Sequence, residues 1–284
     1  MTMRWRIILA YLVVITFAAT ILLIFNSKSY AEKNDVIKKH NVVYEDLSSY
    51  FTGFSGTFVM YDLEHKQYTI YNKSKSEKRL SPNSTFKVPH ALFGLQTGVL
   101  EDENTMFQWD GTEYPFPQWN QDQTLTQAIQ NSTIWYFQEV SSRLGENREQ
   151  YFLHRIHYGN EDISGGLTHF WLQSSLKISP IEQVDFLKRF YTYQLPFFHR
   201  NIDIVKKILV LDQKDGAMLS GKTGTGWKDG VINGIPVNGN FIGYVEKDGN
   251  ANIFATNIEA DNLASSSKAK QITLQILKDK KIFE

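Results

Sequence analysis

Strand-like segments lie at both ends of this 284-residue sequence, and helix-like segments fill its middle. Runs of β-branched and aromatic residues predict strands over residues 56–62, 67–72, 217–222, 240–246 and 252–257. Apolar residues three and four apart predict helices over residues 84–98, 125–129, 135–144, 148–157, 181–193 and 268–279. Because both ends of the chain supply strands, we expect an α+β fold, with one sheet backed by helices.

The amino end differs in kind from the rest of the chain. Residues 7–25 carry no charge, and Arg4 and Arg6 precede them. Such a stretch can span a bilayer as a helix, and the arginines favour a short amino end inside the cell. A signal peptide cleaved after Ala31 is the competing interpretation, and a buried soluble helix is a third. The first two place the folded body outside the cytoplasm, either on the outer face of the membrane or secreted.

We therefore expect three parts: residues 1–25 as an anchor or signal peptide, residues 26–41 as a polar tether, and residues 42–284 as one folded domain. Thirty Lys and Arg balance thirty Asp and Glu, which gives no sign of a nucleic-acid surface. The absence of cysteine excludes disulfides and thiol catalysis. His154 and His157 have no partner of recognisable spacing, so we expect no metal site.

A serine and a lysine lie three residues apart at Ser84 and Lys87. The same spacing recurs at 174/177, 265/268 and 267/270, so spacing alone is a weak signal. The first pair, however, opens a predicted helix, whose free amides attract negative charge and whose residues three apart share a face. Serine becomes a nucleophile when a base takes its proton, and an amine can act as that base only when apolar surroundings lower its pKa.

Four further segments follow in order along the chain. In the Lys-Thr-Gly triplet at 222–224, the lysine could bind a carboxylate, and Gly224 would let a ligand approach the strand. Ser132 could pass a proton, or serve only as a helix N-cap. Tyr-Gly-Asn at 158–160 could be a plain turn, and Trp171 could be plain core. Together and in this order they are typical of serine enzymes that attack β-lactams.

From about residue 56 to the carboxyl end, the sequence resembles class D serine β-lactamases, the oxacillinase type, and especially those of Gram-positive bacilli. The resemblance rests on Ser-Thr-Phe-Lys at 84–87, Tyr-Gly-Asn at 158–160, Phe-Trp-Leu at 170–172 and Lys-Thr-Gly at 222–224, with the aromatic stretch at 135–138 in support. It implies the fold of penicillin-binding proteins, a mainly antiparallel five-stranded sheet with helices on both faces.

The resemblance also implies catalytic roles. Ser84 would attack the β-lactam carbonyl and become acylated. Lys87 would combine with carbon dioxide to form a carbamate, which would act as the general base, and no other cofactor is implied. The indole N–H of Trp171 would hold that carbamate, because a donor to a charged acceptor makes a strong hydrogen bond. Ser132 would pass a proton to the leaving nitrogen, and Ile134 would supply part of the apolar wall around the amine.

Substrate binding is implied at the downstream strand. Lys222 and Thr223 would orient the carboxylate of the β-lactam beside Gly224. The backbone amides of Ser84 and Thr225 would form the oxyanion hole. The expected partners are therefore β-lactam small molecules, together with the membrane if the amino-terminal span is retained.

Three departures from the family pattern concern substrate range more than acylation. Asn240 stands where the strand after Lys-Thr-Gly usually begins with Trp. The arginine that commonly grips the carboxylate from the last helix is missing, with Lys268 or Lys270 as substitutes. The segment 227–236 is glycine-rich. Class A enzymes match less well, because they have Ser-Asp-Asn where this chain has Ser-Thr-Ile at 132–134.

Two other functions compete with hydrolysis. One is a β-lactam sensor that is acylated without turnover. Sensors often have Asn at the position of Ile134, and they need an intracellular part, whereas about six residues precede the apolar span here. The other is a peptidoglycan transpeptidase or carboxypeptidase, which is less favoured because Trp171 and Tyr-Gly-Asn at 158–160 are class D features. The sequence therefore predicts a β-lactamase.

Overall fold

The structure is a computed structural model that describes residues 41–284. The expected anchor or signal peptide at 1–25 lies outside the described residues, as does all of the expected tether except its last residue. Within residues 41–284, no helix combines the length and the apolar character needed to cross a membrane. Residues Val43–Glu284 form one compact unit.

Within residues 41–284, most of the strands lie toward the two ends and most of the helices lie in the middle. The strands are β1 Asn41–Tyr44, β2 Ser55–Asp62, β3 Gln67–Tyr71, β4 Met106–Phe107, β5 Gln123–Thr124, β6 Val210–Lys214, β7 Ala217–Trp227, β8 Pro236–Lys247 and β9 Asn250–Glu259. The α-helices are α2 Lys73–Ser76, α3 Lys87–Thr97, α4 Leu125–Gln130, α5 Ile134–Leu144, α6 Glu146–Ile156, α7 Pro180–Tyr191, α8 His199–Ile208 and α9 Ser266–Asp279. The 3₁₀ helices are η1 Ser48–Phe51, η2 Asn83–Phe86, η3 Pro117–Trp119 and η4 Lys228–Gly230.

The main sheet has seven strands in the order β1-β3-β2-β9-β8-β7-β6. β2 pairs antiparallel with β3 and β9, β8 with β9 and β7, and β7 with β6. The expectation of five strands is therefore wrong. The five strands predicted from sequence are the inner five, and β1 and β6 were missed because they are short edge strands with mostly exposed side chains and no buried face to impose an alternating pattern.

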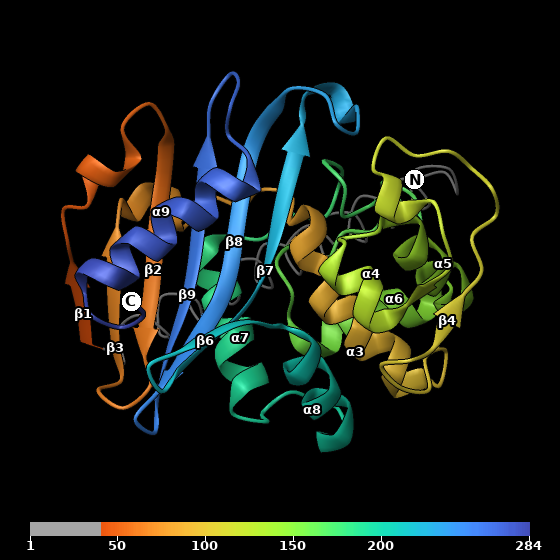
Figure 1. The fold of residues 1–284 in the computed structure, drawn as a ribbon, viewed down its shortest axis with the longest axis horizontal. Helices are drawn as coiled ribbons and strands as arrows, with labels where there is room; N and C mark the ends of the chain where they lie inside the picture. The colour runs from red at the N-terminus through yellow and green to blue at the C-terminus, as the bar shows by residue number, and fades with distance from the viewer. Residues whose placement is uncertain (1–40) are drawn as a thin grey trace, which may run out of the picture. The chain divides into compact units, whose positions relative to one another are not determined.

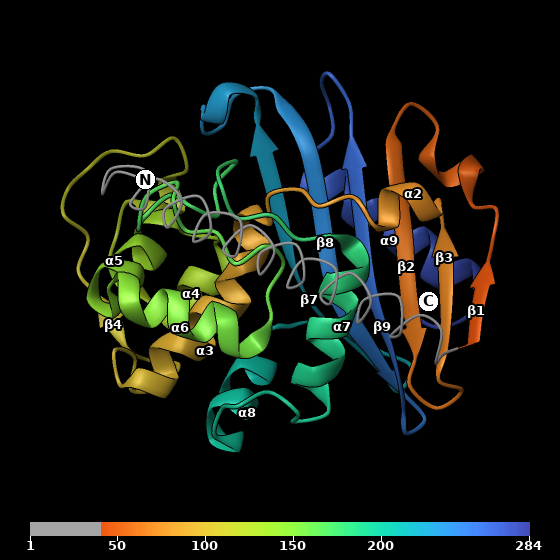
Figure 2. The ribbon, with the colours of Figure 1, turned by 180° about the vertical axis from the view of Figure 1, so that it is seen from behind.

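Helices cover both faces of this sheet, as expected. α9 lies in front of the sheet in Figure 1, and α7 lies in front of it when the molecule is turned around in Figure 2. The helices α3 to α6 gather on the side of the sheet where β7 lies (Figures 1 and 2). The α+β class is confirmed.

Local chemistry explains where the helices that carry the site begin and end. The predicted helix at 84–98 divides into η2 and α3, and Gly98 closes α3 with a φ of 75°, the left-handed conformation that glycine adopts most easily. α7 begins with a capping box between Ser179 and Glu182, with Pro180 at its first position. These signals fix where α3 ends and where α7 begins.

Candidate active site

Ser84 lies in η2, directly before α3, and is 7% exposed. Lys87 is the first residue of α3 and is 0% exposed. The Lys87 Nζ donates a hydrogen bond to the Ser84 Oγ at 2.8 Å. The structure thus brings the two side chains into direct contact, as their spacing predicts.

The surroundings of Lys87 favour a neutral amine. Burial lowers the pKa of Lys87 well below its ordinary value of 10.5, and the nearby charge of Lys222 lowers it further. The ring of Phe137 lies 5.5 Å from the Nζ, and Ile134 and Trp171 are buried. A neutral amine is what both base catalysis and reaction with carbon dioxide require.

Trp171 carries an unused hydrogen-bond donor. Its side chain is fully buried, and its indole N–H has no hydrogen-bond partner among the described residues. Its ring packs against Phe86, the residue before Lys87, with centroids 6.0 Å apart. A buried donor without an acceptor is unfavourable, so this position suits an added hydrogen-bond acceptor.

A second serine–lysine contact lies beside the first. The Lys222 Nζ of β7 donates to the Ser132 Oγ at 3.0 Å and to the Thr223 carbonyl oxygen at 3.2 Å. Burial lowers the pKa of Lys222 to about 7, and the charge of Lys270 contributes. Ser132 has a φ of 58°, and the N-cap of α5 is Thr133. Ser132 is therefore not the N-cap of this helix.

Strand β7 runs directly against the nucleophile. A Cβ placed on Gly224 would lie 2.9 Å from the Pro82 carbonyl oxygen and 3.1 Å from the backbone nitrogen of Ser84. Only glycine fits this approach. The next residue, Thr225, accepts a hydrogen bond from the Ser266 amide at 3.0 Å, which ties β7 to the start of α9. The amides expected to form the oxyanion hole thus come from two adjacent segments, and their role stays a prediction.

The structure separates the two lysines of the last helix. Lys268 is exposed and donates to the side chain of Gln271. Lys270 is half-buried, with its Nζ 5.8 Å from the ring of Phe241, and its charge acts on Lys222. Of the two, Lys270 is therefore the one whose charge lies near Lys222.

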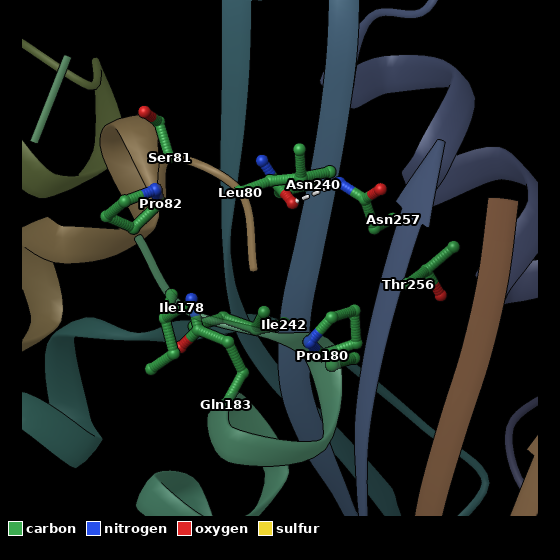
Figure 3. Close-up of a pocket in the computed structure, with 11 residues that line it drawn as sticks. Leu80, Ser81, Pro82, Ile178, Pro180, Gln183, Asn240, Ile242, Thr256 and Asn257 are labelled. Atoms are coloured by element: carbon green, nitrogen blue, oxygen red, sulfur yellow. Dashed lines mark hydrogen bonds between the residues drawn. The ribbon is translucent and has the colours of Figure 1, made fainter. Parts of the chain in front are cut away.

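Asn240, which replaces the usual tryptophan, is buried behind this strand. It pairs with Gly224 of β7 on one side, and its Oδ1 accepts a hydrogen bond from the Asn257 Nδ2 at 2.7 Å on the other. Figure 3 shows both asparagines at a small cavity, with Pro82 on the opposite wall. The cavity measures about 10 Å³, the room of a single water. Asn240 thus contacts both neighbouring strands, β7 through its backbone and β9 through its side chain, and it leaves the small cavity without an aromatic ring.

A series of side-chain hydrogen bonds links Tyr158 to Thr85, the residue after Ser84, and the sequence predicted only part of it. The hydroxyl of Tyr158 donates to the Gln183 Oε1 at 3.2 Å, and the Gln183 Nε2 donates to the Thr85 Oγ1 at 3.0 Å. Gly159 has a φ of 62°, and a Cβ there would overlap the Lys177 carbonyl oxygen, so the turn requires glycine. Gln183 was missed, although a glutamine on the apolar face of a predicted helix is a signal for a buried polar contact.

The histidines His154 and His157 lie on the surface. Contrary to expectation they do have an acidic neighbour, because the His154 Nδ1 is 3.0 Å from the Glu161 Oε2. Among the described residues, no group of three or more His, Asp and Glu side chains is arranged to hold a metal ion.

Fold and site together define a domain in which a buried lysine contacts a serine and a sheet strand runs against that serine. A family model described as the penicillin binding protein transpeptidase domain matches residues 14–278. The chain belongs to this family, and its relatives within it are class D β-lactamases and penicillin-sensor domains.

Two curated relatives illustrate both groups. The chain is 45% identical over 245 residues to the regulatory protein BlaR1 of Bacillus licheniformis, and the matched region covers 86% of this chain and 40% of BlaR1. It is 41% identical over 242 residues to the probable β-lactamase YbxI of Bacillus subtilis, and the matched region covers 85% of this chain and 87% of YbxI. The chain therefore spans less than half the length of BlaR1 and most of YbxI.

Solved structures give the same two groups. The class D β-lactamase BAT-2 superposes with a TM-score of 0.79 at 42% identity, covering 84% of this chain and 97% of BAT-2. The C-terminal domain of the Bacillus licheniformis BlaR penicillin-receptor superposes with a TM-score of 0.81 at 44% identity, covering 86% of this chain and 98% of that domain.

Proposed function

We propose that this domain hydrolyses β-lactams through an acyl-enzyme on Ser84. The observation that carries the proposal is the 2.8 Å contact between the Ser84 Oγ and an amine of Lys87 that is fully buried. A lysine in such a place has lost most of its tendency to be charged, and an uncharged amine beside a serine can activate it.

We further propose that Lys87 is carbamylated. Its neutral amine would form an N–C bond to carbon dioxide and release one proton. The unpaired indole N–H of Trp171 supports this, because it offers the negative group a donor. The carbamate supplies a base for the proton of the Ser84 hydroxyl and later for that of the hydrolytic water.

In acylation, the Ser84 Oγ attacks the β-lactam carbonyl carbon as the hydroxyl loses its proton. The amides of Ser84 and Thr225 stabilise the oxyanion, and such donors contribute about 3 kcal/mol each. The carbon–nitrogen bond of the β-lactam ring then breaks, and the Ser132 hydroxyl donates its proton to the leaving nitrogen. Lys222, which donates to Ser132, can return that proton.

In deacylation, a water attacks the ester carbonyl carbon and the carbon–oxygen bond to Ser84 breaks. The Ser84 Oγ regains a proton and the ring-opened acid leaves. Lys222 and Lys270 hold the carboxylate of the substrate throughout, and an anion beside them raises the fraction of Lys222 that is charged.

The second candidate function is a penicillin sensor that is acylated and not turned over. The similarity to BlaR1 and to the BlaR penicillin-receptor domain favours it. Ile134 favours turnover instead, because it is buried and the resemblance to class D enzymes implies that it forms part of the wall around Lys87, where the amide of an asparagine would disturb a carbamate. A transpeptidase or carboxypeptidase remains the third candidate, since the family model bears that name.

A chromogenic cephalosporin assay with mass spectrometry of the quenched protein separates these functions. Hydrolysis predicts an adduct on Ser84 that forms and clears within the assay. A sensor or transpeptidase predicts an adduct that forms and stays. We also propose that the domain works outside the cytoplasm, either anchored by residues 1–25 or released by cleavage after Ala31.

A further inference from the structure

A buried glutamine of α7, Gln183, is bonded to the turn that carries the nucleophile. The residue is 5% exposed, although glutamine usually lies in solvent. Its Nε2 donates a hydrogen bond to the Thr85 Oγ1 at 3.0 Å, and Thr85 directly follows Ser84. Its Oε1 accepts a hydrogen bond from the Tyr158 hydroxyl at 3.2 Å. Both ends of the buried amide are therefore paired, as burial of a polar group requires.

The hydrogen atoms in this series of bonds leave one arrangement. The Thr85 hydroxyl has a single hydrogen, and it donates that hydrogen to the Pro82 carbonyl oxygen at 2.8 Å. Toward Gln183, the Thr85 Oγ1 therefore acts as an acceptor, which requires a donor on that side of the amide. The other side of the amide accepts from Tyr158. A side chain at position 183 must thus donate in one direction and accept in the other, and glutamine does so without a charge.

The turn from Pro82 to Thr85 sets two parts of the site. It is closed twice, because the Thr85 amide also donates to the Pro82 carbonyl oxygen, at 3.2 Å. The backbone nitrogen of Ser84 lies within this turn, 3.1 Å from where a Cβ on Gly224 of β7 would be. The Ser84 hydroxyl accepts from Lys87 out of the same turn. A shift of Thr85 would therefore move both the nucleophile and the amide expected in the oxyanion hole.

Helix α7 gives Gln183 a base that does not depend on its own amide. The helix begins with a capping box and packs against β2, β8 and β9. The neighbouring Glu182 accepts hydrogen bonds from Arg79 at 2.6 Å and 2.9 Å, and Arg79 also donates to the Gly159 carbonyl oxygen at 2.8 Å. These bonds join α7 to the turn after Tyr158 without Gln183. We therefore expect the fold to survive the loss of the Gln183 amide.

We propose that Gln183 is a positioning residue for Ser84. By donating to the Thr85 Oγ1, it keeps the Thr85 hydrogen directed at the Pro82 carbonyl oxygen, and so holds the turn that presents the Ser84 hydroxyl and amide. This inference rests on the proposed function in one respect, namely that Ser84 is acylated by a β-lactam. It applies to hydrolysis and to a sensor alike.

The test measures acylation at Ser84 directly. The full chain is mixed with a fluorescent penicillin and quenched at intervals, which gives the acylation rate constant and the penicillin concentration for half-maximal rate. In Gln183→Met, which keeps the length of the side chain and removes both hydrogen bonds, the rate constant should fall on the order of 10- to 100-fold, as for a misplaced reacting group. The half-maximal concentration should stay within about twofold, because no substrate contact is lost.

Two further variants separate positioning from stability. Ile276→Ala, in the apolar core beneath α9, lowers stability away from this turn and should be acylated at the wild-type rate. Gln183→Met leaves the buried Tyr158 hydroxyl without its acceptor, which is unfavourable. The double variant Gln183→Met with Tyr158→Phe removes that hydroxyl, so it should fold even if the single variant does not, and its acylation should be slowed equally.

Gln183→Glu gives a readout that a merely structural role would not move. A protonated carboxyl at this position can donate to Thr85 and accept from Tyr158, whereas an ionised carboxyl can only accept. The acylation rate constant, divided by that of the wild type, should therefore be near one at about pH 5, where burial favours the protonated form, and should fall as the pH rises. For Gln183→Met the same ratio should not change with pH.

Other ionisable groups do not produce this difference. Those that bond to the series or to its neighbour are Tyr158, whose pKa is raised by burial, and Glu182, which pairs with Arg79. The wild type contains them too, so their effects cancel in the ratio. The cavity beside Gln183, shown in Figure 3, is lined by residues that do not ionise in this range of pH.

The outcomes are distinct. A wild type that is acylated, together with an unchanged rate constant in Gln183→Met, or in the double variant if Gln183→Met does not fold, overturns the positioning role and leaves the proposed function intact. A ratio for Gln183→Glu that does not fall with pH also overturns the positioning role. A wild type that is not acylated at Ser84 overturns both, and a wild-type adduct that forms and is never cleared overturns hydrolysis alone.

Discussion

The two cores of this domain differ in the polarity of the groups that they bury. The core between the sheet and α9 is almost wholly apolar, with Phe58, Phe241 and Phe254 packed against Ile276. The aromatic core around α3 instead encloses an amine, a close contact between His90 of α3 and Glu149 of α6, and an unpaired indole N–H. The first arrangement serves stability, and the second keeps polar groups out of water where the chemistry needs them.

The largest effect is expected at the nucleophile. Ser84→Ala removes the only hydroxyl proposed to be acylated, so hydrolysis should fall on the order of 10⁶-fold and labelling by a fluorescent penicillin should disappear. The fold should persist, as shown by an unchanged circular dichroism spectrum. Labelling that survives this change would mean that another serine is acylated.

Lys87→Ala should have the next largest effect. Loss of a general base lowers the rate on the order of 10²- to 10⁴-fold, so deacylation should stop on the assay time scale and mass spectrometry should find any adduct that forms still in place. The melting temperature should change little, because removing the buried amine relieves a desolvation cost that offsets the cavity left by the lysine stem. Rapid clearance of the adduct from this variant would contradict the role of Lys87.

The apolar core should give the opposite result. Ile276→Ala should lower the free energy of unfolding by about 2–5 kcal/mol, because it leaves a cavity in a packed core. Activity per folded molecule at 25 °C should stay within about twofold of the wild type, checked by urea unfolding and cephalosporin hydrolysis. A large loss of activity would show that the two cores are coupled.

A smaller effect should appear in the pH dependence of stability. Burial places the pKa of Lys222 in the folded protein at about 7, below its ordinary value of 10.5. Between these pH values the unfolded chain binds more protons, so stability should rise with pH, by up to about 1.4 kcal/mol per unit. Lys222→Met should flatten this rise in urea unfolding at pH 7 and pH 9, and an equal slope in both proteins would refute the shift.

The sequence predicted what local patterns encode. The inner five strands and most helices carry clear periodicity, and the order of the motifs pointed to the site. β6 was missed because it is exposed along its whole length. α8 was also missed, although its buried Ile202, Val205 and Ile208 lie three residues apart and form one apolar face. The contact between His90 and Glu149 joins two helices, and no spacing along the chain encodes it.

The choice between Lys268 and Lys270 shows the same limit. Both lie on one predicted helix, and only the way that helix packs decides which faces the site. The structure buries Ala269 and Ile272 against the sheet, which leaves Lys268 in solvent and Lys270 half-buried, close enough for its charge to lower the pKa of Lys222. The sequence therefore indicated both lysines, and the tertiary structure was needed to tell which of the two is near Lys222.

The most direct measurement is the rate of cephalosporin hydrolysis before and after bicarbonate is removed from the buffer. If a water-shielded amine at position 87 works through a carbon-dioxide adduct, the rate should drop on removal and recover when bicarbonate is returned. A rate that does not change when bicarbonate is removed would contradict the proposed carbamate on Lys87.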